Sequence, residues 1–206
     1  MRTLPFTLRG HHVELVPLAR DHALALADAA AADRSSYRFT EVPSGDAEMT
    51  AYIDRLLAQR DGDAAVPFAQ RRVADGRLVG CTRFMELRWW SSDDVPDEVE
   101  IGGTWLAGDA QRSGVNTEAK LLLLTHAFDV WGVRRVALCT DARNDASRAA
   151  IARIGARFEG VLRHHRPSTV QGEHGRLRDS ALYALTDDDW PAVEDGLQAR
   201  LSAGAR

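Results

Sequence analysis

The residues best suited to chemistry lie in one stretch of the chain, Glu100 to Thr117. Its first part, Glu100 to Leu106, carries the branched and aromatic residues of a strand. Gly108 and Asp109 then interrupt this pattern. Between Gln111 and Asn116 the side chains are mostly small or polar, so backbone NH groups can be exposed. A helix is predicted from Thr117, and its unpaired first NH groups and macrodipole favour a bound phosphate. The stretch therefore predicts an anion site.

A second block follows a strand predicted from Arg135 to Thr140. Asn144 comes shortly after that strand, Ser147 lies three residues further on, and Gly155 lies eleven residues after the asparagine. Ser147 falls in the first turn of a helix predicted from Ala146 to Ile154. Glycine-bearing turns between a strand and a helix occur in many proteins that bind no phosphate. It is the order and spacing of both blocks that is informative.

The two blocks resemble segments of the GNAT superfamily of N-acyltransferases, and within it the RimJ/RimL-like branch of ribosomal-protein-alanine N-acetyltransferase type. Gln111 and Gly114 match the loop that holds the acetyl-CoA pyrophosphate in that family, Q/R-x-x-G-x-G/A. Asn116 stands where the family prefers glycine or alanine, and Arg112 stands where the branch often has glycine. Asparagine tolerates positive φ and caps helices well, which is compatible with the backbone of such a loop. The resemblance extends over most of the chain.

The resemblance implies a role for the residues of both blocks. Asn144 would meet the pantetheine arm of acetyl-CoA, and a backbone NH near Trp105 and Leu106 would polarise the thioester carbonyl. Ser147 would donate a proton to the leaving thiolate, because Ile151 replaces the tyrosine that many members use. The implied cofactor-binding residues are Trp105, Leu106, Gln111, Arg112, Ser113, Gly114, Val115, Asn116, Thr117, Asn144 and Ser147.

Glu100 is the first candidate for a general base. It lies eleven residues before Gln111, which is the spacing of the base in histone-acetylating members of the family, and partial burial among apolar groups would make it a better proton acceptor. The alternative is an ordinary strand residue that faces solvent. For Ser147 the alternative is a serine at a helix start that bonds the local backbone. A different route would use Cys139 to carry the acyl group.

The remaining pattern predicts a mixed α/β (α+β) fold in one domain, residues 1–206, with a frayed end from Ser202. The family resemblance adds a central, mostly antiparallel sheet of six or seven strands flanked by helices. A leucine-rich helix from Thr117 to Trp131 is apolar on most sides and is predicted to be buried, which would fix its N-terminus. The other predicted elements are strands at His12–Leu18, Phe68–Ala74 and Arg77–Arg88 with two more after Ile154, and helices at Arg20–Ala32, Asp46–Arg60 and beyond Asp187.

Composition argues against several classes of protein. The 206 residues are 45% hydrophobic and 27% charged, which is close to globular averages. The leucine run at 121–124 is far short of the roughly 20 apolar residues that span a membrane, and the start of the sequence lacks the apolar core of a signal peptide, so a cytoplasmic location is expected. A net charge of −4 argues against general nucleic-acid binding. Cys81 and Cys139 are too isolated to predict a disulfide or a zinc site.

These observations predict an acetyl-CoA-dependent N-acetyltransferase that transfers an acetyl group to a primary amine by direct attack in a ternary complex. A protein N-terminus is the first candidate acceptor, in part because an α-amine has a pKa of about 8 and lysine one of about 10.4. One alternative is an acyltransferase for small amines or antibiotics, with acetyl or succinyl as the acyl group. Another is a CoA-binding sensor or partner protein without activity. No metal, nucleic acid or membrane partner is expected, and a homodimer is left open.

Overall fold

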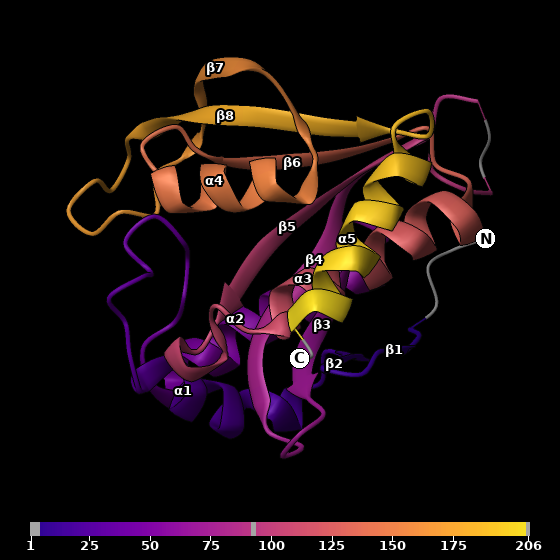
Figure 1. Cartoon of the computed structure of the whole chain (residues 1–206). Coiled ribbons are helices and arrows are strands. Elements are labelled where there is room, and N and C mark those ends of the chain that lie inside the picture. The colour runs from indigo at the N-terminus through magenta and orange to yellow at the C-terminus, as the bar shows by residue number, and fades with distance from the viewer. Residues whose placement is uncertain (1–4, 92–93, 205–206) are drawn as a thin grey trace.

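Eight strands form one sheet in the computed structural model, which describes residues 5–91 and 94–204. The spatial order is β1-β2-β3-β4-β5-β6-β8-β7, and every neighbouring pair is antiparallel except β5 and β6 (Figure 1). The strands are β1 Leu8–Arg9, β2 Val13–Pro17, β3 Ala65–Arg72, β4 Leu78–Arg88, β5 Glu98–Leu106, β6 Arg135–Asp141, β7 Arg157–Pro167 and β8 Leu177–Thr186.

Five α-helices accompany the sheet in the described part of the chain. They are α1 Ala23–Ala31, α2 Gly45–Asp61, α3 Gly114–Thr125, α4 Asp145–Ile154 and α5 Trp190–Gly204. A π-helical segment, His126–Trp131, continues α3. The predicted mixed α/β fold with a mostly antiparallel sheet is confirmed. The sheet has eight strands where six or seven were expected, because the two-residue strand β1 adds an edge to β2. The chain from Ser202 to Gly204 is helical where a frayed end was predicted, and residues 205–206 lie outside the described part.

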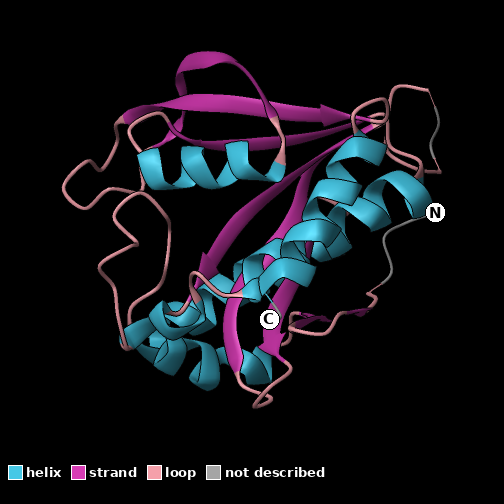
Figure 2. Cartoon of the chain, viewed as in Figure 1, coloured by secondary structure: helices cyan, strands magenta, loops and turns pink. Residues whose placement is uncertain are grey.

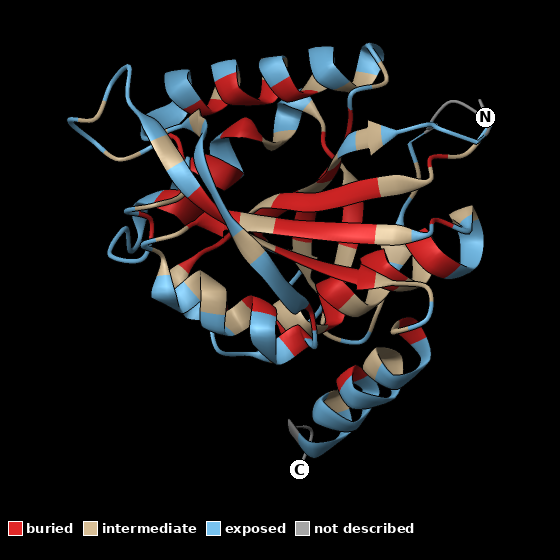
Figure 3. Cartoon of the chain, turned by 90° about the horizontal axis from the view of Figure 1, so that it is seen from above, coloured by how far each residue is buried: buried red, intermediate tan, exposed pale blue. Residues whose placement is uncertain are grey.

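Helices cover both faces of the sheet (Figure 2). One hydrophobic cluster joins Val13, Phe68 and Ile101 of the strands to the apolar residues of α3, α4 and α5. A second cluster joins Ala69 and Trp105 to α1 and α2. The buried residues therefore gather along the middle of the sheet, between the two helical layers (Figure 3). None of the helices in the described part of the chain is both long enough and apolar enough to cross a membrane.

The parallel pair β5 and β6 separates early. Its pairing covers only Glu98–Glu100 of β5 and Arg135–Ala137 of β6. Beyond Glu100, β5 continues beside β4 to Leu106, while β6 continues beside β8 (Figure 1). The edge of β5 that faces β6 is therefore unpaired with a strand from residue 101 onward, so backbone groups along this edge before Leu106 can bind a ligand.

A bulge in β5 lies within this unpaired part. Trp105 pairs with Cys81 of β4, and Gly102 pairs with Arg83, so β5 has one residue more than β4 between the two pairs. Gly103 supplies the left-handed backbone that the bulge needs, with φ of 56°.

The bulge reverses which face of the sheet each side chain occupies. Ile101 and Leu106 both belong to the cluster with α3, although simple alternation would place them on opposite faces, and Trp105 belongs to the cluster with α1 and α2. By the same alternation, Glu100 faces the side of α1 and α2, whereas Thr104 faces α3. The opening between β5 and β6 therefore presents different side chains to the two faces of the sheet.

Candidate active site

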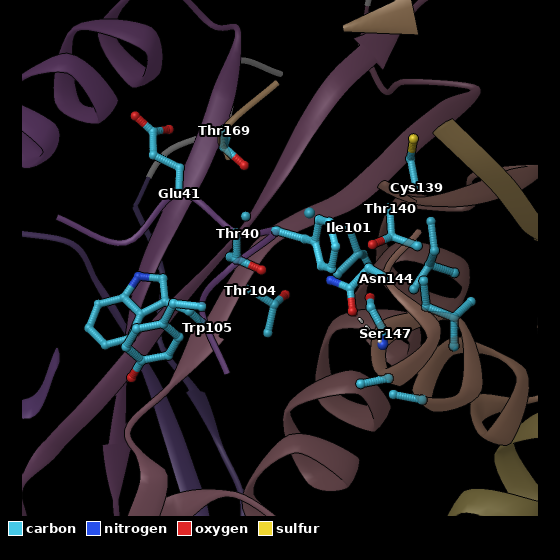
Figure 4. A pocket seen from close by; sticks show the side chains of 18 of the residues that line it. Thr40, Glu41, Ile101, Thr104, Trp105, Cys139, Thr140, Asn144, Ser147 and Thr169 are labelled. Atoms are coloured by element: carbon cyan, nitrogen blue, oxygen red, sulfur yellow. Dashed lines mark hydrogen bonds between the residues drawn. The ribbon is translucent and has the colours of Figure 1, made fainter. Parts of the chain in front are cut away.

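A cavity of about 520 Å³ lies where β5 and β6 separate. Its walls come from β5, the middle of β6, the start of α3, and α4, with one side closed by the segment between α1 and α2 (Figure 4). Seven of the residues predicted for the site line it, namely Glu100, Trp105, Leu106, Gln111, Asn116, Asn144 and Ser147. Arg112, Ser113, Gly114, Val115 and Thr117 lie beside it, in the turn before α3 and its first turn.

Helix α3 begins at Gly114, three residues before the predicted start at Thr117. Ser113 is the N-cap, with an extended backbone and a side-chain oxygen that accepts a hydrogen bond from Val115 N at 3.3 Å. The residue with positive φ is Arg112, at 57°, and not Asn116, which is helical. The roles expected of Asn116 as a cap or a left-handed residue are therefore wrong, because Ser113 caps the helix before the chain reaches it.

The first turn of α3 is braced by the N-terminal part of the chain. A Cβ atom on Gly114 would lie 2.7 Å from the ring of His12, so glycine is needed for this close approach. The buried carboxylate of Glu118 accepts hydrogen bonds from the backbone N of His11, His12 and Val13 at 2.8, 2.6 and 2.9 Å. The turn before β2 is thus fastened to α3 on the side away from the cavity.

Gln111 fastens the turn before α3 to the end of β5. Its side-chain NH₂ donates to the carbonyl of Leu106 at 2.9 Å and to the hydroxyl of Ser36 at 2.8 Å. Since Ser113 Oγ accepts only from Val115 N, the other NH groups of the first turn of α3 remain open to an anion.

Asn144 and Ser147 lie together at the start of α4 (Figure 4). Asn144 Oδ1 accepts a hydrogen bond from Ser147 N at 3.1 Å, which caps the helix and leaves the side-chain NH₂ of Asn144 for a ligand. No described residue hydrogen-bonds the Ser147 hydroxyl, so the alternative in which this hydroxyl bonds the local backbone is not observed.

Glu100 is buried, with 4% of its surface exposed, and it is paired with Arg166 of β7. The guanidinium donates to both carboxylate oxygens, at 2.8 and 2.7 Å. The expected apolar surroundings are therefore wrong, and so is the alternative of a solvent-facing strand residue. Each carboxylate oxygen accepts from the guanidinium and retains a further lone pair that a water molecule can use.

Neither cysteine has the surroundings of a nucleophile. Cys81 is fully buried, and burial raises the pKa of its thiol to about 12. Cys139 lines the cavity, and burial together with the charge of Glu100 raises its pKa as well. Its sulfur makes a long hydrogen-bond contact with His165 Nδ1, at 3.9 Å. Both thiols are free and are expected to be protonated at neutral pH.

A second cavity of about 900 Å³ adjoins the first on the side of α1 and α2. The two share Tyr37, Thr40, Glu41 and Thr169, so they are continuous. The second cavity is walled by the segment between α1 and α2, by α2 itself and by the loop between β7 and β8. The sequence analysis had assigned no site residue to these segments.

Arg143 holds the loops around the second cavity together. Its guanidinium donates to Asp141 at 2.9 and 2.7 Å and to Glu173 of the β7–β8 loop at 2.8 and 3.0 Å. It also lies over the ring of Phe39, 5.3 Å from the centroid. Hydrogen bonds from Arg143 and Ser168 lower the pKa of Glu173 to about 2, so this contact is an ion pair at neutral pH.

Sequence reasoning missed five charged residues that line the main cavity, Arg166 and Lys120 among them. Arg166 gave no local signal, because its partner Glu100 is 66 positions away. Lys120 could have been found, since it is the only lysine in the sequence and it interrupts an apolar helix. In the described part of the chain, no group of three or more His, Cys, Asp or Glu side chains is arranged to hold a metal ion.

Residues 12–157 match the family model described as an acetyltransferase (GNAT) domain, and the chain therefore belongs to the GNAT family of acetyltransferases. A curated protein of Bacillus subtilis (strain 168), named "Putative ribosomal N-acetyltransferase YdaF", is 34% identical over 116 residues, which are 56% of this chain and 57% of that protein. The chain thus spans little more than half the length of this relative. The predicted GNAT and RimJ/RimL-like resemblance is confirmed.

Solved structures agree with this assignment. A GCN5-related N-acetyltransferase from Brucella melitensis superposes with a TM-score of 0.84 at 28% identity, covering 99% of this chain and 91% of that one. RimJ of Mycobacterium smegmatis in complex with CoA-disulfide gives a TM-score of 0.77 at 24% identity, covering 95% of each chain, which shows a shared fold. The chain is accordingly an acyltransferase of this family.

Proposed function

We propose that the protein transfers the acetyl group of acetyl-CoA to a primary amine, and that the preferred acceptor is the N-terminus of a protein or peptide. One observation carries this proposal, namely the cavity between the separated strands β5 and β6, which has the start of α3 at one end and the second cavity at the other. A donor and an acceptor can therefore approach the same point from opposite faces of the sheet.

The residues around the start of α3 fit the cosubstrate. The open NH groups of its first turn suit a pyrophosphate. The unpaired edge of β5 and the side-chain NH₂ of Asn144 offer hydrogen bonds to the amide groups of a pantetheine arm. Acetyl-CoA supplies the acetyl group as a thioester. The residues of this chain position the two substrates and transfer the protons.

The second cavity supports a peptide as the acceptor. Its size and its walls of loop segments leave room for an extended chain that would lead an amine toward Glu100. Glu100, held in place by Arg166, would accept the proton of the amine through a water molecule. The name of the curated relative, a putative ribosomal N-acetyltransferase, points in the same direction.

The acceptor can be tested with a panel of amines and a thiol-detecting assay for released CoA. We expect short peptides with free N-termini to be acetylated with kcat/KM at least tenfold above their N-terminally blocked counterparts that carry a lysine. Turnover of small amines alone would favour the small-molecule alternative. If acetyl-CoA binds and no amine is turned over, the sensor alternative is supported.

The route of acyl transfer gives a second prediction. Ser147 lines the cavity with an unbonded hydroxyl, whereas the Cys139 thiol has a raised pKa. Ser147→Ala should therefore lower kcat by about 10-fold to 100-fold through loss of the proton donor, and Cys139→Ala should retain most of the activity. Initial-rate plots with both substrates varied should intersect. Parallel plots, or an acyl label that stays on the denatured protein and is lost in Cys139→Ala, would support a covalent route instead.

A further inference from the structure

Lys120 is the most unusual basic residue of the chain. It is the only lysine, since every other one of the 26 basic residues is an arginine. Only 5% of its surface is exposed, although lysine is among the residues least often buried. It lies on α3 and lines the main cavity. Asn116, which is one helical turn before it on the same face of α3, lines the same cavity.

The ammonium group of Lys120 has no counter-ion among the described residues. Its one hydrogen-bond partner is the hydroxyl of Thr104, at 2.8 Å, and that hydroxyl also contacts Thr82 at 2.9 Å. A buried charge without a partner is costly, so a lysine in this position tends to lose its proton. Burial lowers the pKa of Lys120 to about 7.

The charged groups around Lys120 are all engaged elsewhere or remote from it. In the cavity, Glu100 is paired with Arg166, and Glu41 is paired with Arg55. On α3 itself, Glu118 faces the turn before β2. On α5, which packs against α3, the acidic residues Glu194 and Asp195 lie at the surface. The other charged groups of the cavity are Arg83 and Arg178, and β1 and β2 carry the pair of Arg9 with Glu14. In the segment after α3, Asp129 accepts a hydrogen bond from the Trp190 indole at 2.9 Å, and burial lowers the pKa of His126 to about 4. Arg200 of α5 is exposed.

A lysine at this position can reach toward the start of its helix. Lys120 is six residues after Gly114, which is about 9 Å along the axis, and side chains on a helix tilt toward the N-terminus. Phosphates at the first turn of α3 would therefore lie near its amino group. A single negative charge about 6 Å away, at an effective dielectric constant of about 20, raises the pKa of an ammonium by about two.

We propose that Lys120 is a cosubstrate-binding residue that is neutral in the free protein and takes up a proton when the phosphates of acetyl-CoA bind at the start of α3. This inference rests on the proposed function, because it requires the cosubstrate at that place. In the bound state the charged Lys120 faces the phosphates. In the free state the neutral amine still donates a hydrogen bond to Thr104 Oγ1 at 2.8 Å, and it needs no counter-ion.

The pH dependence of the proton uptake on binding follows from these two states of Lys120. Below pH 6 Lys120 is charged with or without ligand, so binding takes up little proton. At pH 8 only about a tenth of the free protein carries the charge, and nearly all of the complex does if its pKa is about 9 or higher. The phosphate groups themselves, with a second pKa of about 6, are already ionised at pH 8 and do not contribute.

Because the sequence has one lysine, the pKa of Lys120 can be measured directly in the free and the bound protein. Protein grown with lysine carbon-13 labelled at Cε gives one side-chain resonance, whose shift can be followed against pH in the free protein and with saturating CoA. We expect a midpoint near 7 without ligand and about 9 or higher with it. Equal midpoints in the two states, with binding verified by calorimetry, would overturn the proposal. Failure of CoA to bind at all would instead reject the proposed function on which it rests.

Calorimetry with variants tests the same proposal independently. At pH 8, acetyl-CoA binding measured in two buffers of different ionisation enthalpy should show an uptake of about 0.5 to 0.9 proton. Lys120→Met should lose the uptake and bind at least tenfold more weakly, whereas Lys120→Arg, whose charge is permanent, should lose the uptake and keep most of the affinity. The control His12→Gln removes an imidazole that lies against the first turn of α3, and this variant should retain the uptake. Uptake that survives in Lys120→Met would contradict the proposal.

Discussion

Replacing Gly114 with aspartate should weaken the binding of acetyl-CoA by roughly 100-fold to 1,000-fold. A carboxylate about 4 Å from a phosphate, at an effective dielectric constant near 20, is unfavourable by about 4 kcal/mol, and each 1.4 kcal/mol is tenfold in affinity. A side chain would also meet the ring of His12, which lies 2.7 Å from where its Cβ would be. Titration calorimetry of the purified variant measures the effect.

The matched control for this change is Gly114→Asn. Asparagine has the shape of aspartate without its charge, so it reproduces the contact with His12 and removes the repulsion. We expect Gly114→Asn to bind at least tenfold more tightly than Gly114→Asp. Circular dichroism of both variants shows whether the fold is kept. Equal affinity of the parent and Gly114→Asp would place the cosubstrate elsewhere.

Replacing Glu100 with glutamine should lower kcat by about 10² to 10⁴ and leave the dissociation constant of acetyl-CoA nearly unchanged. Glutamine keeps one oxygen for Arg166, so the pair that fixes this position is weakened and not removed. It cannot accept the proton of an amine. Raising the pH should partly restore the rate, because more of the acceptor is then already neutral.

The control for this prediction lies two residues away on the same strand. Glu98 is also paired with arginines, at 3.9 Å from Arg88 and 3.4 Å from Arg135, but it does not line the cavity. Glu98→Gln should therefore show the parent's kcat. Rates of Glu100→Gln equal to those of the parent across the pH range would make Glu100 a structural partner of Arg166 and nothing more.

Local sequence patterns predicted the parts of the site that are built locally. Gln111, Asn144 and Ser147 line the cavity because each belongs to one short segment between a strand and a helix, where the chain itself determines what is exposed. The helix start was placed three residues late because both Ser113 and Asn116 are good capping residues. Ser113 is the cap because its backbone is extended, and the spacing of apolar residues in the sequence does not indicate this.

The parts of the site that depend on the fold were not predictable from local patterns. Arg166 reaches Glu100 from β7, which is 66 positions further along the chain and is separated from β5 by β6 and β8 in the sheet. Lys120 lies in a helix predicted to be apolar on most sides and largely buried, and this pattern does not indicate which of its side chains line a cavity. The second cavity lies between the α1–α2 segment with α2 on one side and the β7–β8 loop on the other, which are far apart in sequence.

Because of the strand order, the residues that match the family model are fewer than the residues that complete the site and the sheet. The family match ends at Arg157, the first residue of β7. A chain that stopped there would keep Glu100 and lose Arg166, leaving a buried carboxylate without its counter-ion. It would also lack β8, so β6 would lose its partner along seven residue pairs and become an open edge. The end of the family match is thus not a position at which this enzyme can be divided.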